Sequence, residues 1–313
     1  MCKTVNLARA RGMCAGVDRA IKIVNLALDK YGTDKVYVLH EVVHNKHVVE
    51  YLRKKGAHFV DSFEEISSPK DKILIFSAHG VGIETFNKAK ELEFKIIDAT
   101  CPVVSGIHRK MNKAGINGLD AVVIGHKGHQ EVVGTVGQYI GDRNKVHVVL
   151  TPEDVAQLSI DPENSFFATQ TTLSIDETAI TIQALKEKYP SIVGPKDNDT
   201  CRATQVRQNA VKQIAAVSDV VIIAGSKNSS NSNRLKEVSE SQGTKAYLVD
   251  DSSQIDPMWF KDANSVGLSA GASAPEYVIE EILSFLNTLG FITVVECGDE
   301  LKEKTFPLKE DLI

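Results

Sequence analysis

The sequence is poor in cysteine, in aromatic side chains and in positive charge. Five of the 313 residues are cysteine and 6% are aromatic, and so few cysteines cannot form the framework of a disulfide-bonded protein. Lys and Arg number 36 against 41 Asp and Glu, which gives a net charge of −5. Because sequence-independent binding to nucleic acid depends on clustered positive charge, we expect no nucleic-acid partner.

Long apolar segments are absent as well. No run reaches the roughly 18 consecutive apolar residues of a membrane span. The N-terminal residues MCKTVNLARARGMC contain neither the apolar core of a signal peptide nor a transit segment. We therefore expect a cytoplasmic protein without a membrane partner. What is present, 42% hydrophobic and 25% charged residues, is typical of a globular protein, and the length allows two or three domains.

Three of the cysteines share one local pattern, because each precedes an amphipathic helix. Apolar residues recur at helical spacing after Cys14, after Cys101 and after Cys201. The second of these cysteines lies 87 residues after the first, and the third lies 100 residues after the second. Each interval is about the length of one small α/β lobe.

Short apolar runs alternate with helical patterns and predict strands of parallel sheets that are covered on both faces. The runs are VNLAR (5–9), KVYVL (35–39), AHFV (57–60), KILIF (72–76), FKII (94–97), AVVI (121–124), VHVVL (146–150), SFFA (165–168), VVIIA (220–224), KAYLV (245–249) and SVGL (265–268). The sequence therefore predicts an α/β fold of three similar doubly wound lobes in a pseudo-threefold arrangement. We expect the lobes at 14–98, at 99–194, and at 195–291 with the N-terminal strand 4–13, followed by a C-terminal tail at 292–313.

Several of these strands are followed by polar turns that contain glycine, and a helical pattern follows each turn. The turns are SAHG (77–80), GHKGHQE (125–131), TQTTLS (169–174), GSKNSSNSN (225–233) and SAGASAPE (269–276). In open parallel sheets, ligands bind at the carboxyl ends of the strands. We therefore expect these turns and the three cysteines to surround one centre.

Cysteine thiolates bind metal, and a helix N-terminus stabilises their negative charge. Cys14, Cys101 and Cys201 are thus candidate ligands of an iron–sulfur cluster or of a zinc ion. The alternative is that each is a small buried apolar residue, as most free cysteines are. Three cysteines in equivalent places favour the metal site. Cys2 and Cys297 lie outside the pattern, and for them we expect no ligand role.

The polar turns carry side chains that suit an anionic ligand. Backbone amides at helix N-termini, hydroxyl groups and imidazoles all bind phosphate oxygens. The candidates are His44, His79, His126, His129, Ser229, Ser230, Asn231 and Ser273. The alternative is local helix capping, since Ser174 with Glu177, and Ser273 with Glu276, both have the spacing of a capping box.

Glu131 and Thr172 are the candidates for proton transfer near these turns. A carboxyl in a closed site acts as an acid when its pKa is raised, and a hydroxyl group can relay the proton. The alternative for Glu131 is a solvated glutamate at a helix end.

Taken together, the motifs resemble those of the 4-hydroxy-3-methylbut-2-enyl diphosphate reductases, the LytB/IspH family. The resemblance covers nearly the whole chain. It rests on RGMCAGVDRA, HEVVHN, IFSAHG, DATCP, IGHKGHQEVVGT, TQTTLS, GSKNSSNSNR and SAGASAP, in that order. Two positions depart from the usual pattern, Met13 before the first cysteine and Gln130 before the glutamate, and the second of these could loosen the loop that aims Glu131.

The resemblance implies a central 4Fe–4S cluster held by Cys14, Cys101 and Cys201, with one iron left open. The implied ligands of the substrate diphosphate are His44, His79, His129, Thr172, Ser229, Ser230, Asn231 and Ser273. Glu131 is the implied proton donor, assisted by the hydroxyl group of Thr172; His126 matches no ligand-binding position of the family.

The implied reaction is the two-electron reductive dehydroxylation of 4-hydroxy-3-methylbut-2-enyl diphosphate to isopentenyl and dimethylallyl diphosphate, the last step of the methylerythritol phosphate route to isoprenoids. Electrons would come from an external donor such as a ferredoxin or flavodoxin, because the sequence has no flavin or nicotinamide fingerprint. Residue types and spacing alone leave two alternatives, a zinc-dependent phosphate-ester hydrolase and a non-catalytic sensor of a cluster or a diphosphate.

Overall fold

The computed structural model describes residues 3–196, 198–299 and 305–308. Contacts group the described residues into two compact units. Unit 1 comprises those within 3–18, 43–51 and 202–305, and unit 2 comprises those within 19–42, 52–201 and 306–308. Three separate parallel sheets form the framework, one in unit 1 and two in unit 2. In the described part of the chain, no helix is long and apolar enough to cross a membrane.

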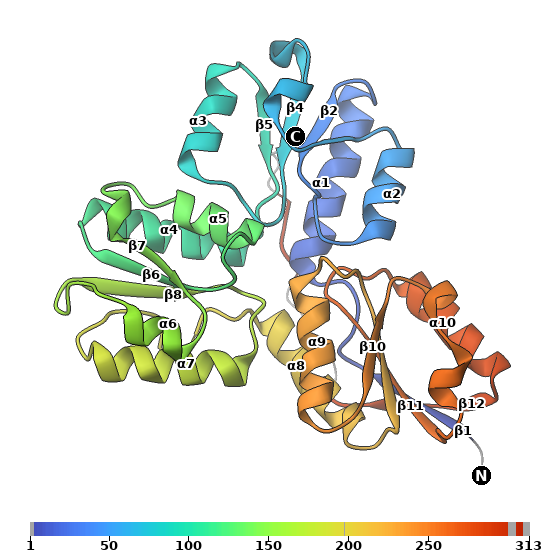
Figure 1. Ribbon diagram of the computed structural model, residues 1–313. Coiled ribbons are helices and arrows are strands. Elements are labelled where there is room, and N and C mark those ends of the chain that lie inside the picture. Colours follow the sequence, from blue (N-terminus) through green and yellow to red (C-terminus); the bar gives the residue numbers. More distant parts are fainter. Residues whose placement is uncertain (1–2, 197, 300–304, 309–313) are drawn as a thin grey trace. The chain divides into compact units, whose positions relative to one another are not determined.

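The first lobe contains a four-stranded parallel sheet in the order β3-β2-β4-β5. Its strands are β2 (Val36–Leu39), β3 (His58–Val60), β4 (Ile73–Phe76) and β5 (Lys95–Asp98). Its helices are α1 (Ala15–Tyr31), α2 (Lys46–Lys54) and α3 (Ile83–Glu91). Apolar residues of α3 pack with those of β2 and β4, and Figure 1 shows α1 on the side of this sheet away from α3.

The second lobe contains a three-stranded parallel sheet in the order β7-β6-β8. Its strands are β6 (Asp120–Ile124), β7 (Val146–Val149) and β8 (Ser165–Thr169), and its helices are α4 (Pro102–Ile116), α5 (Gln130–Gly137), α6 (Pro152–Gln157) and α7 (Ile175–Lys188). One core forms between the sheet and α4 with α5, and another between the sheet and α6 with α7. Every residue of β6 is buried, as expected for a central strand between two helical layers.

The third lobe contains a five-stranded parallel sheet in the order β10-β9-β11-β1-β12. Its strands are β1 (Lys3–Ala8), β9 (Val220–Ala224), β10 (Ala246–Val249), β11 (Ser265–Ala270) and β12 (Phe291–Cys297), and its helices are α8 (Arg202–Ala215), α9 (Ser230–Ser241) and α10 (Glu276–Thr288). One core faces α10 and the other faces α8 and α9. Short 3₁₀ segments at 63–65, 69–71, 143–145, 252–254 and 257–260 lie in the connections of the three lobes.

The prediction of three α/β lobes with parallel sheets is confirmed, and the N-terminal strand pairs with β11 as expected. The C-terminal boundary differs from the expected one. Residues 291–297 form β12, which pairs in parallel with β1 at the edge of the third sheet, so that this sheet extends beyond the tail boundary expected at 292. The run FITVVEC has the β-branched and aromatic composition of a strand, and its largely exposed side chains fit an edge position.

Candidate functional site

The three cysteines of the repeated pattern lie where the sequence places them, directly before helices. Cys14 precedes α1, Cys101 is the N-cap residue of α4, and Cys201 precedes α8. None of the three, nor Cys297, is in a disulfide, and all four are half-buried. Cys2 lies outside the described residues. Partly accessible thiols at helix N-termini have the character expected of metal ligands.

Backbone hydrogen bonds attach each cysteine to one of the polar turns. In unit 1, the Cys14 amide donates to the carbonyl oxygen of Ala272 at 3.0 Å. In unit 2, the Cys101 amide donates to Ala78 at 3.0 Å, and the Cys201 amide donates to Thr171 at 3.1 Å. The thiols are therefore held at the carboxyl ends of β11, β4 and β8, where a parallel sheet binds its ligands.

A buried arginine fixes the loop before Cys14. Arg207 on α8 has no exposed surface, and its guanidinium group donates to the carbonyl oxygen of Gly12 at 2.7 and 3.0 Å and to that of Met13 at 3.2 Å. Position 13 thus contributes through its backbone, so methionine there leaves this contact intact. No sequence motif pointed to Arg207. The available signal was a charged residue on the same helical face as Ala203, Ala210 and Ile214.

The turn after β9 and the turn after β11 meet in unit 1 through side chains. Asn231 accepts a hydrogen bond from the Ala272 amide at 2.8 Å, and the Ser273 hydroxyl donates to the carbonyl oxygen of His44 at 2.9 Å. Ser229 is the N-cap of α9, where its hydroxyl accepts from the Ser232 amide. Three of the expected diphosphate ligands, His44, Asn231 and Ser273, thereby lie together around two strand ends, and Ser229 lies at the start of the same helix as Asn231.

The capping alternative holds for one of its two sites. Ser174 is the N-cap of α7 and accepts from the Glu177 amide. Ser273 does not cap α10, because the N-cap there is Pro275. The Ser273 hydroxyl instead bonds the His44 backbone, so its place in the turn is not explained by capping.

Unit 2 places two of the expected histidines side by side. The rings of His79 and His129 meet edge to face with their centroids 6.0 Å apart. His129 is the N-cap of α5, and its Nδ1 accepts from the Glu131 amide at 3.1 Å. Because Nδ1 accepts, the neutral ring carries its hydrogen on Nε2, which can donate to a phosphate oxygen.

Glu131 is buried rather than solvated, with 3% of its surface exposed. Its carboxylate accepts from the Thr171 amide at 2.6 Å and from the Thr171 hydroxyl at 2.8 Å. Burial raises the pKa of Glu131 to about 7, against the opposing effect of these two hydrogen bonds, and the charge of Asp199 adds to the rise. A carboxyl group with this pKa gives and takes protons near neutral pH.

The hydroxyl group that contacts Glu131 belongs to Thr171, whereas the sequence analysis expected Thr172. The Thr172 hydroxyl accepts from the Gln170 side chain at 2.9 Å. Gln170 in turn accepts from the His126 amide at 3.0 Å, so it links the turns after β6 and β8. Neighbouring threonines in TQTTLS are indistinguishable by type, and only the path of the backbone decides which one reaches the carboxylate.

Each unit considered by itself, no three His, Cys, Asp or Glu side chains among the described residues lie close enough to hold a metal ion. The cysteine set is divided, with Cys14 in unit 1 and Cys101 and Cys201 in unit 2. The expected diphosphate ligands are divided too, since His79, His129 and Thr172 belong to unit 2 and the others to unit 1. The common centre expected from the sequence therefore stays a prediction.

Comparison with known proteins decides the family. The model of the family described as "LytB protein" matches residues 5–287. The chain belongs to the LytB family. LytB relatives named 4-hydroxy-3-methylbut-2-enyl diphosphate reductase include that of Aeromonas salmonicida, 49% identical over 307 residues and 98% of both chains, and that of Pseudoalteromonas translucida, 47% identical over the same shares.

Solved LytB-family structures resemble the chain as well. The reductase from Plasmodium falciparum is 33% identical, with a TM-score of 0.92 over 100% of this chain and 97% of its own. A second reductase, described as the terminal enzyme of the non-mevalonate pathway, is 31% identical, with a TM-score of 0.63 over 91% and 99% of the chains. The family resemblance stated from the motifs is confirmed, and the LytB family implies an iron–sulfur cofactor.

Proposed function

We propose that the chain reduces 4-hydroxy-3-methylbut-2-enyl diphosphate to isopentenyl and dimethylallyl diphosphate. The carbon–oxygen bond of the hydroxyl group breaks, two electrons and two protons enter, and water leaves. The observation that carries this proposal is the near-full-length identity of 47–49% to relatives named for this activity. It favours the reductase over a zinc-dependent hydrolase and over a non-catalytic sensor.

The chain's thiols suit an iron–sulfur cluster. Three half-buried cysteines outside disulfides lie at the starts of helices, where the N-terminal dipole stabilises thiolate. We assign Cys14, Cys101 and Cys201 as ligands of a 4Fe–4S cluster in which the fourth iron has no cysteine ligand. When bound, such a cluster supplies electrons and a Lewis-acidic iron. An external donor such as a ferredoxin or flavodoxin would deliver the electrons.

The polar turns hold the diphosphate in this proposal. Hydroxyl, amide and imidazole groups from His44, His79, His129, Thr172, Ser229, Ser230, Asn231 and Ser273 would bind its oxygens. Binding energy obtained far from the reacting carbon orients that carbon. The buried carboxyl of Glu131, whose pKa is raised to about 7, holds a proton for delivery, and Thr171 positions the carboxyl through two hydrogen bonds.

An anaerobic assay with a reduced mediator and the hydroxylated diphosphate tests the proposal. We expect two electrons consumed per molecule of product, together with iron and acid-labile sulfide in the purified protein. Glu131→Gln should keep the cluster and bind substrate, but lose most of its turnover, typically 100-fold or more for loss of a general acid. Zinc in place of iron, or no product from the iron-loaded protein, would contradict the proposal.

A further inference from the structure

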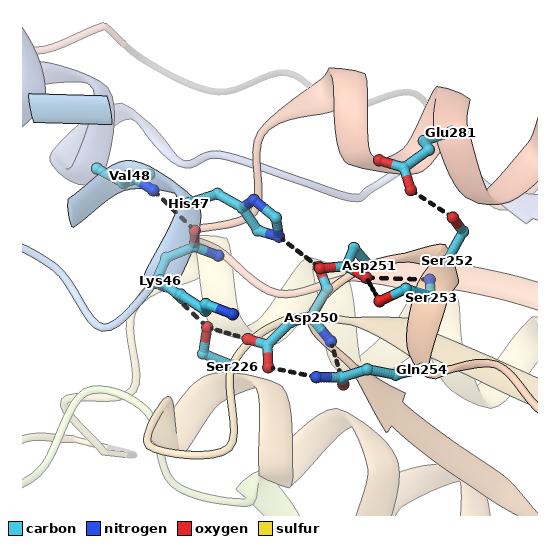
Figure 2. Close-up of polar contacts among 11 residues, drawn as sticks. Lys46, His47, Val48, Ser226, Asp250, Asp251, Ser252, Ser253, Gln254 and Glu281 are labelled. Atoms are coloured by element: carbon cyan, nitrogen blue, oxygen red, sulfur yellow. Dashed lines mark hydrogen bonds and ion pairs between the residues drawn. The ribbon is translucent and has the colours of Figure 1, made fainter. Parts of the chain in front are cut away.

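The segment that carries His44 is attached to the third lobe by a set of polar contacts outside the expected site. Residues 43–51 and the lobe belong to the same unit. Just after His44, the Lys46 amide donates to the Ser226 hydroxyl at 3.0 Å. The Ser226 hydroxyl donates to the Asp250 carboxylate at 2.6 Å. Figure 2 shows Ser226 between Lys46 and Asp250.

The Ser226 hydroxyl makes two hydrogen bonds, one to the segment that carries His44 and one to the loop after β10. Ser226 is 4% exposed, and it accepts from one backbone amide while donating to one carboxylate. Asp250 is itself fixed, because its other carboxylate oxygen accepts from the Gln254 side chain at 3.1 Å and its amide donates to Gln254 at 2.9 Å. Because Ser226 bonds both groups, the fixed Asp250 side chain also fixes the place of the Lys46 amide.

A second contact stabilises the same attachment. His47 Nε2 lies 3.1 Å from the carbonyl oxygen of Asp250 and 3.4 Å from the Asp251 carboxylate. Hydrogen bonding from Ser253, with smaller contributions from the charges of His47 and Lys46, holds the pKa of Asp251 below its usual range. The carboxylate facing His47 is therefore ionised at neutral pH.

The contacts surround His44 along the chain. Its own carbonyl oxygen accepts from Ser273 after β11. Asn45 accepts from the Val48 amide at the start of α2, Lys46 bonds Ser226 after β9, and His47 bonds the loop after β10. Three neighbouring strand ends of one sheet thus hold three of these four consecutive residues, and Asn45 bonds within its own segment.

We infer that Ser226, supported by Asp250, is a positioning residue that aligns His44 for the diphosphate. This inference rests on the proposed function, because it takes His44 as a diphosphate ligand. Ser226 itself is committed to the Lys46 amide and to Asp250. It lies in the same turn as Ser229 and Ser230, so the turn serves two tasks: its first hydroxyl fixes the histidine segment, and its later ones bind the ligand.

Binding of inorganic pyrophosphate to the anaerobically purified full chain tests this role by a double-mutant cycle. We expect Ser226→Ala to weaken pyrophosphate binding about fivefold. This loss corresponds to part of the free energy of one hydrogen bond to a charged group. In a His44→Ala background the same change should add nothing, because Ser226 acts through His44. Asp250→Ala should follow Ser226→Ala, and it serves as the second variant if Ser226→Ala does not fold.

Ser252→Ala is the matched control, because Ser252 lies in the same loop region and its hydroxyl contacts Glu281, away from residues 43–51. It should bind pyrophosphate as the wild type does. An unchanged affinity in Ser226→Ala, an equal penalty in the His44→Ala background, or wild-type affinity in His44→Ala would overturn the inference. Failure of the reductase assay with this cycle intact would contradict only the proposed function.

Discussion

At the residue scale, the carboxyl group of Glu131 is the proposed proton donor of the chain. Glu131 is the second residue of α5. Its backbone amide donates to His129, and its carboxylate accepts from Thr171. Removal from water raises the pKa of Glu131 to about 7, since a buried carboxylate loses its solvation. The same burial that makes Glu131 an acid near neutral pH also makes the folded protein sensitive to pH.

The stability of the protein should report this pKa directly. A carboxyl whose pKa rises from 4.5 to about 7 on folding binds its proton more tightly in the folded state. Its contribution is complete below pH 4.5 and is lost as the pH rises through 7. Between pH 5 and pH 8, we expect the free energy of unfolding to fall by about 2 kcal/mol more in the wild type than in Glu131→Gln.

Denaturant unfolding of the apo-protein at the two pH values measures this difference, because the contributions of all other titrating groups cancel between the two proteins. Parallel pH dependence of the wild type and the glutamine variant would show that Glu131 titrates at its ordinary value.

The two adjacent threonines predict different pH profiles. The Thr171 hydroxyl lowers the pKa of Glu131 against the effect of burial. Thr171→Val should therefore raise that pKa and move the loss of kcat on the alkaline side to higher pH. Thr172→Val is the matched control, since the Thr172 hydroxyl contacts Gln170. If the alkaline loss of kcat moved to higher pH in Thr172→Val and kept its wild-type position in Thr171→Val, the assignment of the two hydroxyl groups would be reversed.

Residue types identified the chemistry at this scale but not the contacts. Glu131 follows from the motif, whereas the choice between Thr171 and Thr172 depends on the backbone path of the turn. Arg207 was hidden in an amphipathic helix, where an arginine is usually solvated. The bonds of its guanidinium to backbone carbonyl groups 194 and 195 residues away leave no local signal in the sequence.

At the element scale, close backbone packing joins α5 to the turn that carries His79. A methyl group on Gly137 would lie 2.6 Å from the Cα atom of Gly82, and one on Gly134 would lie 2.9 Å from the carbonyl oxygen of Gly80. Glycine on both sides allows this approach. It brings the residues at the start of α5 next to the histidine turn within unit 2.

Two Gly→Ala substitutions should have opposite effects. In Gly137→Ala the new Cβ meets backbone atoms that cannot rotate away, so we expect a loss of about 1–3 kcal/mol in the free energy of unfolding. In Gly106→Ala, within α4, the nearest atom is 3.8 Å away, and we expect a gain of about 0.5–1 kcal/mol from helix propensity. Denaturant unfolding of both variants decides this, and stabilisation by Gly137→Ala would show that the contact with Gly82 is not tight.

Elements were the most predictable level of the structure. The buried strands are continuous apolar runs, and the three helices after the cysteines follow from their apolar spacing. The edge strand β12 was missed although its run FITVV has the composition of a strand. Its place in the sheet was not predictable, because the pairing with β1 is a contact between the two ends of the sequence. Sequence spacing could not show that Ser273 fails to cap α10, since its hydroxyl bonds a residue 229 positions away.

At the scale of the whole molecule, the proposed reaction depends on cooperation between parts of the chain that are distant in sequence. The cysteines precede α1, α4 and α8, and unit 1 and unit 2 each supply some of them. Sequence patterns can identify three equivalent thiols. They cannot show that the thiols share one cluster, because the distances between the lobes are a property of tertiary structure alone.

The most direct measurement is the iron and acid-labile sulfide content of anaerobically purified Cys→Ser variants. The wild type and the control Cys297→Ser should each contain about four of both per chain, as a 4Fe–4S cluster requires. Cys14→Ser, Cys101→Ser and Cys201→Ser should each lose most of both, along with reductase activity. A full complement of iron and sulfide in Cys14→Ser would contradict the account, because the cluster would then need no ligand from unit 1.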